Sequence, residues 1–112
     1  MPTPSHKELE DYILGMPGAR LDYPFGEGVA VYKAGQGEDA KMFALVAEKS
    51  DPIRLSLKCD PLLAQTLRER YETVMPGYHL NKKHWNTIVL AGQLTWPEIQ
   101  DLIRHSYNLV TS

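Results

Sequence analysis

The sequence predicts an α+β domain of two layers, in which an antiparallel sheet of about four to five strands is packed by three helices. Three observations predict this class. Three segments begin with helix start signals, several others alternate apolar and polar residues, and the turns between consecutive strand segments are short. Because short turns join antiparallel neighbours, the helices must form a separate layer against one face of the sheet.

The three helices are predicted by their first residues. Residues 5–8 and 95–98 each have the spacing of a capping box, in which a Ser or Thr oxygen accepts a backbone N–H and a Glu reaches back. Residues 60–61 are Asp-Pro, a helix cap followed by proline at the first helical position. Apolar residues recur on one face of each segment, and residues 15–18 and 72–77 end the first two helices.

The first predicted strands form a hairpin. Residues 29–33 alternate, residues 34–39 form a glycine-rich turn, and residues 41–49 return as the second strand. The strand at 29–33 is interpreted as a sheet edge on which a second copy of the chain could pair, although Lys33 and the turn argue against that pairing. We therefore expect a monomer or a weak dimer.

The clearest alternation in the chain lies at residues 53–59. It places Arg54 and Lys58 on the sheet face opposite the apolar side chains, where they face solvent or a partner. A last strand is expected over about residues 84–90.

Length and charge limit the function classes. The chain has 112 residues, enough for one domain spanning residues 1–112. It has 12 Lys and Arg against 14 Asp and Glu, for a formal net charge of −2. That balance excludes a protein that binds nucleic acid by bulk positive charge, so any site for a polyanion must be a local patch.

Signals for targeting are not visible in the sequence. No segment has the apolar core of a signal peptide, and no apolar stretch approaches the roughly 18 residues of a membrane span. The single cysteine, Cys59, excludes an internal disulfide and fits the reducing cytosol. We expect a cytoplasmic protein with no membrane partner.

Residues 75–88 are the densest cluster of chemically distinctive side chains. Lysine neutralises phosphates, asparagine hydrogen-bonds to bases or phosphates, and aromatic rings stack on bases. A plainer interpretation stays open, in which the lysines are a solvated loop, the histidines bond to backbone, and the tryptophan anchors the next strand in the core. The residues concerned are Tyr78, His79, Asn81, Lys82, Lys83, His84 and Trp85.

A catalytic set, a cofactor motif and a metal site are all absent from the pattern. The sequence has no P-loop, no dinucleotide glycine fingerprint and no nucleophile elbow. His79 and His84 have no Cys or Glu at ligand spacing, and Cys59 is expected to be an inert buried thiol. We expect no enzyme activity, no cofactor and no metal.

Four stretches, in the same order along the chain as in a known family, carry a resemblance: Tyr-Pro-Phe-Gly at 23–26, Leu-Lys-Cys-Asp-Pro at 57–61, residues 76–86, and Ser-Tyr-Asn-Leu-Val at 106–110. On these motifs the chain resembles the MmcQ/YjbR family of small bacterial proteins. The resemblance implies an α+β fold similar to bacterial frataxin, with a double-wing arrangement. It also implies the label of DNA-binding protein, which for most members is an inference from fold, and it brings no catalytic residues.

The leading hypothesis is a DNA-binding module that acts weakly through a hairpin at residues 78–84, with its sequence preference left open. Lys82 and Lys83 would contact phosphates, Asn81 and His79 would hydrogen-bond, and the Tyr78 ring would pack on sugar or base. The full predicted set is Lys82, Lys83, His79, Asn81, His84, Tyr78, Lys58 and Arg54.

The alternative is a domain that binds a small molecule or a protein, with the same residues around a pocket and no catalysis. A structure discriminates between the two hypotheses. Convergence of Arg54, Lys58, Lys82 and Lys83 on one convex face favours DNA. A concave pocket lined by Tyr23, Tyr78, His79 and Trp85 favours a small ligand.

Overall fold

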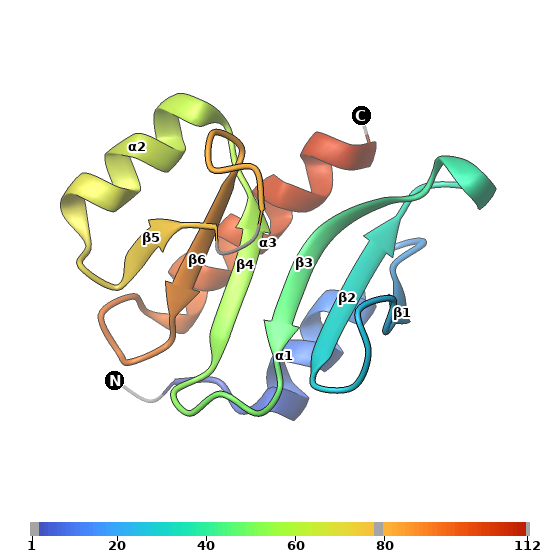
Figure 1. The fold of residues 1–112 in the computed structure, drawn as a ribbon, viewed down its shortest axis with the longest axis horizontal. Helices are drawn as coiled ribbons and strands as arrows, with labels where there is room; N and C mark the ends of the chain where they lie inside the picture. The colour runs from blue at the N-terminus through green and yellow to red at the C-terminus, as the bar shows by residue number, and fades with distance from the viewer. Residues whose placement is uncertain (1–2, 78–79, 112) are drawn as a thin grey trace.

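The computed structural model describes residues 3–77 and 80–111 of the chain. Figure 1 shows a twisted sheet with helices packed on it, which confirms the predicted α+β class. In chain order the elements are α1 His6–Leu14, β1 Arg20–Asp22, β2 Val29–Ala34, the 3-10 helix η1 Gly37–Asp39, β3 Lys41–Ala47, β4 Arg54–Lys58, α2 Pro61–Arg70, β5 Val74–Pro76, β6 Trp85–Val89 and α3 Trp96–Thr111.

The described strands form one antiparallel sheet of six strands in the order β1-β2-β3-β4-β6-β5. The expected number was about four to five, so the difference is the pair of edge strands, β1 and β5. Each has three residues, which is too short to display the alternation that identifies a strand in sequence.

The position of β2 corrects one expectation. Residues 29–33 were interpreted as a sheet edge, but β2 pairs with β1 on one side and with β3 on the other. The backbone groups of β2 are therefore used within the chain, and β1 and β5 are the edges instead. Their shortness limits the number of hydrogen bonds that a second copy could form there.

The three helices cover a single face of the sheet, and α1 and α3 lie behind the strands in Figure 1. The main core joins Leu9 and Ile13 of α1 and Ile99 and Ile103 of α3 to the inward side chains of the strands. Leu67 of α2 packs at its margin. Burial of these apolar side chains is the main force that holds the two layers together.

The opposite face of the sheet carries no described helix, and we refer to it as the helix-free face. Strand alternation and pairing register assign side chains to it, because the residues between them point into the core. Its members are Arg20, Asp22, Val29, Val31, Lys33, Met42, Leu45, Ala47, Arg54, Ser56, Lys58, Met75, Trp85, Thr87 and Val89.

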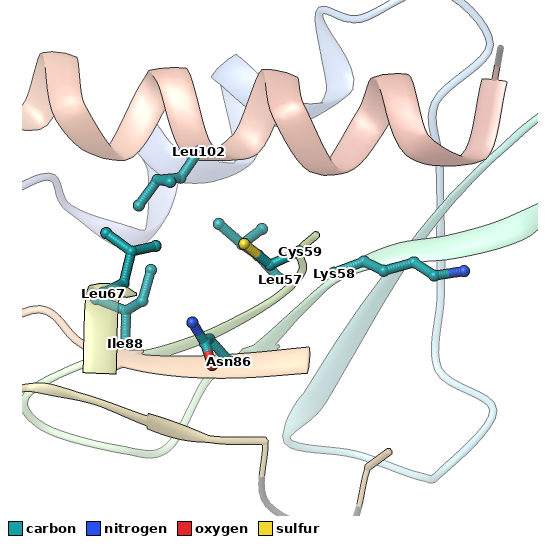
Figure 2. A pocket seen from close by; sticks show the side chains of 7 residues that line it. All are labelled: Leu57, Lys58, Cys59, Leu67, Asn86, Ile88 and Leu102. Carbon is teal, nitrogen blue, oxygen red and sulfur yellow. The ribbon is translucent and has the colours of Figure 1, made fainter. Parts of the chain in front are cut away.

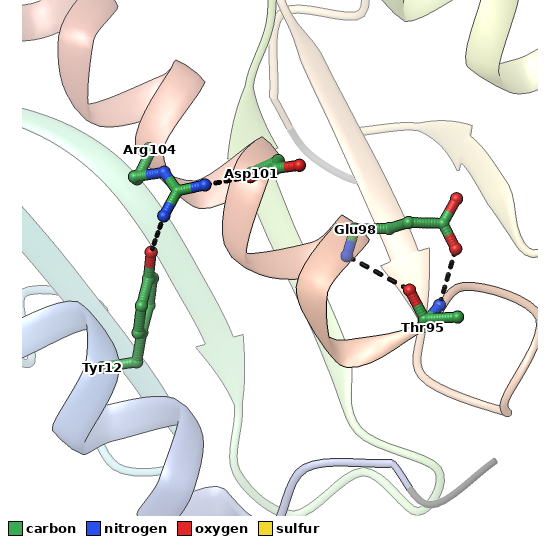
Figure 3. A network of polar contacts seen from close by, with 5 residues as sticks. All are labelled: Tyr12, Thr95, Glu98, Asp101 and Arg104. Atoms are coloured by element: carbon green, nitrogen blue, oxygen red, sulfur yellow. Dashed lines mark hydrogen bonds and ion pairs between the residues drawn. The ribbon is translucent and has the colours of Figure 1, made fainter.

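The predicted helix caps are present. Ser5 and Glu8 form a reciprocal capping box at α1, and the Asp60 side chain accepts two backbone N–H groups at the start of α2. Thr95 and Glu98 form the second capping box, at α3 (Figure 3). The hydrogen bonds that Thr95 gives Glu98 lower the pKa of that carboxyl group below its ordinary value.

The middle of α3 is tied to the sheet by a buried serine. Ser106 is 0 % exposed; its Oγ donates to the carbonyl of Phe43 and accepts a 3.0 Å bond from the backbone N–H of Lys58. Phe43 lies beside an irregularity in the β2–β3 pairing. The Ser106 hydroxyl therefore pairs with the Phe43 carbonyl and the Lys58 amide, two backbone groups that the strand pairing leaves without a partner.

Within residues 3–77 and 80–111, none of the helices combines the length and apolar character needed to cross a membrane.

Candidate nucleic-acid interface

Strand β4 presents its two cations as predicted. Leu55 and Leu57 are buried in the core, and Arg54, Ser56 and Lys58 therefore lie on the helix-free face. The two basic residues are four positions apart on the extended strand, a distance of about 13 Å along β4. Arg54 and Lys58 thus share a face but lie at opposite ends of the strand.

Lys58 lies next to the connection between β5 and β6, because it pairs directly with Trp85 at the start of β6. Figure 2 shows the Lys58 side chain extending away from the small cavity whose wall its backbone helps to form. The amide of Cys59, the next residue, donates to the carbonyl of His84 at 2.7 Å. The end of β4 and the end of the connection are thereby held side by side.

The predicted hairpin is the connection between β5 and β6, which pair with each other antiparallel. Asn81 forms the turn: its Oδ1 accepts from the Lys83 amide at 2.9 Å, and its carbonyl accepts from the His84 amide at 3.2 Å. Lys82 and Lys83 are exposed, and His84 is half-buried. We refer to the exposed residues Asn81, Lys82 and Lys83 as the basic connection.

Two predicted site residues, Tyr78 and His79, lie outside the described residues. The glycine before them is described. A Cβ on Gly77 would lie 2.7 Å from the Cβ of Trp85 and 3.2 Å from the Cβ of Leu80. The hairpin therefore closes so tightly at its base that only glycine fits without displacement of the chain.

Trp85 is a structural residue, in agreement with the plainer interpretation of the motif. Its side chain is only 7 % exposed and forms a second hydrophobic cluster with Val31 and Leu45 on the helix-free face. Leu80 packs against the same cluster and brings the connection down onto the sheet. The tryptophan ring is therefore not free to stack on a nucleic-acid base.

Arg68 of α2, which no sequence pattern indicated as a site residue, bonds to the connection from the side of the helical layer. Its guanidinium donates to Oδ1 of Asn86 at 2.6 Å, to the carbonyl of Trp85 at 3.1 Å and to the carbonyl of Lys82. In sequence, a basic residue in the last turn of a helix is explained by the helix dipole. Only the tertiary structure brings its acceptors to it.

Two further cations were missed, Arg20 on β1 and Lys33 on β2. Both face away from the core because their neighbours Leu21, Tyr32 and Ala34 pack into it. Arg20 is the direct partner of Lys33 in the pairing register. The alternation of residues 29–33 could have identified Lys33, since it has the same phase as Val31.

Charge is unevenly distributed over the molecule. Among the strand residues of the helix-free face the only acid is Asp22, which forms a 4.0 Å ion pair with Lys33. The other two described ion pairs lie on α1 and α3. Arg54, Lys58, Lys82 and Lys83 form no ion pair with any acid in residues 3–77 and 80–111.

Three cavities of the described structure are lined by residues other than Asn81, Lys82 and Lys83. The space beside Lys58 holds about 10 Å³, which is roughly the room for one water. A groove of about 440 Å³ lies between α1 and α3, and one of about 340 Å³ lies beside β1 and η1. Neither of these is lined by any of residues 80–84.

The Tyr-Pro-Phe-Gly motif at residues 23–26 is an exposed turn after β1. The Tyr23 hydroxyl donates to Glu48 at 3.1 Å, and Tyr23 and Phe25 are 42 % and 61 % exposed. Neither residue lines one of the described cavities. In the described part of the chain, no three His, Cys, Asp or Glu side chains are grouped to hold a metal ion.

Comparisons with known proteins agree with this architecture. A family model described as YjbR matches residues 14–109. The uncharacterized protein YjbR of Escherichia coli K12 is 37 % identical over 89 % of this chain and 81 % of its own. The uncharacterized protein YbdF of Escherichia coli O157:H7 is 33 % identical over 94 % of this chain and 83 % of its own.

Solved structures show the same fold. The crystal structure of Deinococcus radiodurans protein DR2400, domain DUF419, superimposes with a TM-score of 0.92 at 37 % identity, covering 98 % of this chain and 80 % of that one. The crystal structure of a Pseudomonas syringae protein, a structural genomics target, gives a TM-score of 0.79 at 30 % identity, with coverage of 96 % and 99 %.

Proposed function

The chain belongs to the YjbR family, and from that premise we propose that it is a DNA-binding protein that contacts phosphates through the basic connection and Lys58. Binding is weak and independent of sequence, because few cations take part and the nearby tryptophan is buried. The proposal includes no chemical step.

The observation that carries the proposal is the set of unpaired cations. Lys58, Lys82 and Lys83 lie around the junction of β4 with the connection, and no acid in the described residues neutralises them. Like charges held close together repel one another, and an external polyanion relieves that repulsion. Arg20 and Lys33 extend the positive charge across β1 and β2.

Small-molecule binding by the same residues has less support. A ligand pocket needs a concave volume of several hundred cubic ångströms, and the described cavities of that size are lined by other residues. The two lysines lie instead on an exposed turn. Arg54 lies at the opposite end of β4 from the connection and is assigned a secondary role.

The test is a titration of a labelled duplex at several salt concentrations. With three phosphate contacts the log–log slope of the binding constant against salt is about −2.7, which is roughly a 40-fold loss of affinity between 50 and 200 mM. The Lys82→Ala/Lys83→Ala variant should reduce the slope to about −0.9. A matched variant, Lys7→Ala/Lys49→Ala, removes the same charge from α1 and from the β3–β4 turn and should leave the slope unchanged.

Two results would overturn the proposal. One is the absence of binding by the unaltered chain at 50 mM salt. The other is an equal loss of affinity in both double variants, which would show that net charge rather than the basic connection governs association.

A further inference from the structure

We propose that Arg68 is the positioning residue of the interface: it fixes the backbone of the basic connection so that Lys82 and Lys83 are presented together. This inference rests on the proposed function for its consequence in binding. Its structural part, the hold on the connection, can be tested without DNA.

The hydrogen bonds of Arg68 all converge on one short stretch of chain. The guanidinium carries five donors in a planar fork, and its three described acceptors belong to residues 82, 85 and 86. Bonds from a charged donor are about twice as strong as neutral ones. A single side chain of α2 thus joins the exposed part of the connection to the first residues of β6.

Asn86 keeps the guanidinium in place. This residue is 2 % exposed, and its Nδ2 donates to the Ala64 carbonyl of α2 at 3.2 Å while its Oδ1 accepts from Arg68. Figure 2 shows the Asn86 side chain standing up from β6 toward the helical layer. The bond to the Ala64 carbonyl fixes the orientation of the Asn86 amide. The amide oxygen in turn fixes the position of the Arg68 guanidinium.

Within the exposed part of the hairpin, Arg68 bonds to the carbonyl of Lys82. The base of the hairpin is closed separately by the Gly77 amide, which donates to the Trp85 carbonyl at 2.9 Å. Loss of Arg68 therefore leaves the Gly77 bond in place but removes the donor to the carbonyl of Lys82, together with those to the Trp85 carbonyl and to Oδ1 of Asn86. The two lysines would then sample more conformations, and binding would require their ordering at an entropic cost.

The first measurement is limited proteolysis, because trypsin cleaves after Lys82 and Lys83. Arg68→Ala should raise the cleavage rate at these bonds by about tenfold or more at a temperature well below the unfolding midpoint. The midpoint itself should fall by about 4–12 °C, because the buried Oδ1 of Asn86 loses its donor. Arg104→Ala is the matched control, since Arg104 bonds to Asp101 and Tyr12 in the helical layer (Figure 3). If Arg68→Ala does not fold, Arg68→Lys keeps the charge but loses the planar fork.

The second measurement is a double-mutant cycle on duplex affinity. Arg68→Ala should weaken binding by about three- to tenfold in the unaltered chain and should have no effect when Lys82 and Lys83 are already alanine. Arg20 lies at the far side of the helix-free face. The free-energy losses of Arg68→Ala and Arg20→Ala on duplex binding should therefore add in the double variant. Equal losses in the presence and absence of the two lysines would show that Arg68 touches DNA itself and would overturn the positioning role.

The outcomes separate the two proposals. Unchanged cleavage after Lys82 and Lys83 in both Arg68 variants overturns the hold by Arg68, whatever the DNA result. If the unaltered chain binds no duplex while cleavage rises as expected, the proposed function and the role of Arg68 in binding fail, and the hold on the connection stands.

Discussion

Ser106→Ala removes a hydroxyl that satisfies two backbone groups of the sheet. The Phe43 carbonyl loses its donor and the Lys58 amide loses its acceptor, and the site is 0 % exposed. A buried polar group left without a partner costs about 1–3 kcal/mol. With partial relaxation of two such groups, we expect a loss of about 2–4 kcal/mol in the free energy of unfolding.

The assay is urea denaturation followed by circular dichroism, with the m-value as a check on two-state behaviour. For a chain of 112 residues this loss corresponds to a fall of about 8–16 °C in the unfolding midpoint. Thr66→Ala is the control, because Thr66 is exposed and its hydroxyl bonds only within its own helix. A loss below about 1 kcal/mol at an unchanged m-value would refute the reasoning.

Three further predictions concern the base of the connection and the buried thiol. Gly77→Ala should lower stability by about 1–3 kcal/mol because of the 2.7 Å contact with Trp85, and an unchanged unfolding midpoint would contradict this. Asn86→Leu removes the side-chain acceptor that fixes the Arg68 guanidinium, so it should speed tryptic cleavage after Lys82 as Arg68→Ala does. Cleavage at the rate of the unaltered chain would show that Asn86 does not keep Arg68 in place. Burial raises the pKa of the Cys59 thiol from 9.0 to about 11, and the nearby Asp60 carboxylate contributes a smaller part of the rise. A thiol reagent at pH 8 should therefore react slowly with the native chain and fast with the unfolded chain. Because the unfolded thiol ionises first, stability should fall as pH rises from about 9 to 11. Cys59→Ala should reduce that fall without abolishing it, because burial also raises the pKa of Tyr32.

The helices and the central strands could be predicted because their signals are local. A capping box, an Asp-Pro start and a period-two alternation each depend on residues within one turn or one strand. The edge strands β1 and β5 could not be predicted, since three residues form a strand only because a longer neighbour supplies the hydrogen bonds. Because β1 was not predicted, β2 was expected to be the edge of the sheet, whereas it lies between β1 and β3.

The candidate site was predicted in part. The exposure of Lys82 and Lys83, the face of Lys58 and the anchoring role of Trp85 agree with the pattern analysis. The binding role of these residues stays a prediction. Arg68 carried no signal, because its partners are 14 to 18 positions away and belong to other elements.

The motif at residues 76–86 serves two purposes that occupy different positions. Gly77, Trp85 and Asn86 are determined by packing and buried hydrogen bonds, whereas Asn81, Lys82 and Lys83 are exposed. Selection for folding alone would therefore preserve the buried positions in a related protein that had lost its ligand. We expect divergence of function within the family to lie in the turn at 81–83, where a change in charge would alter the proposed contact with phosphates.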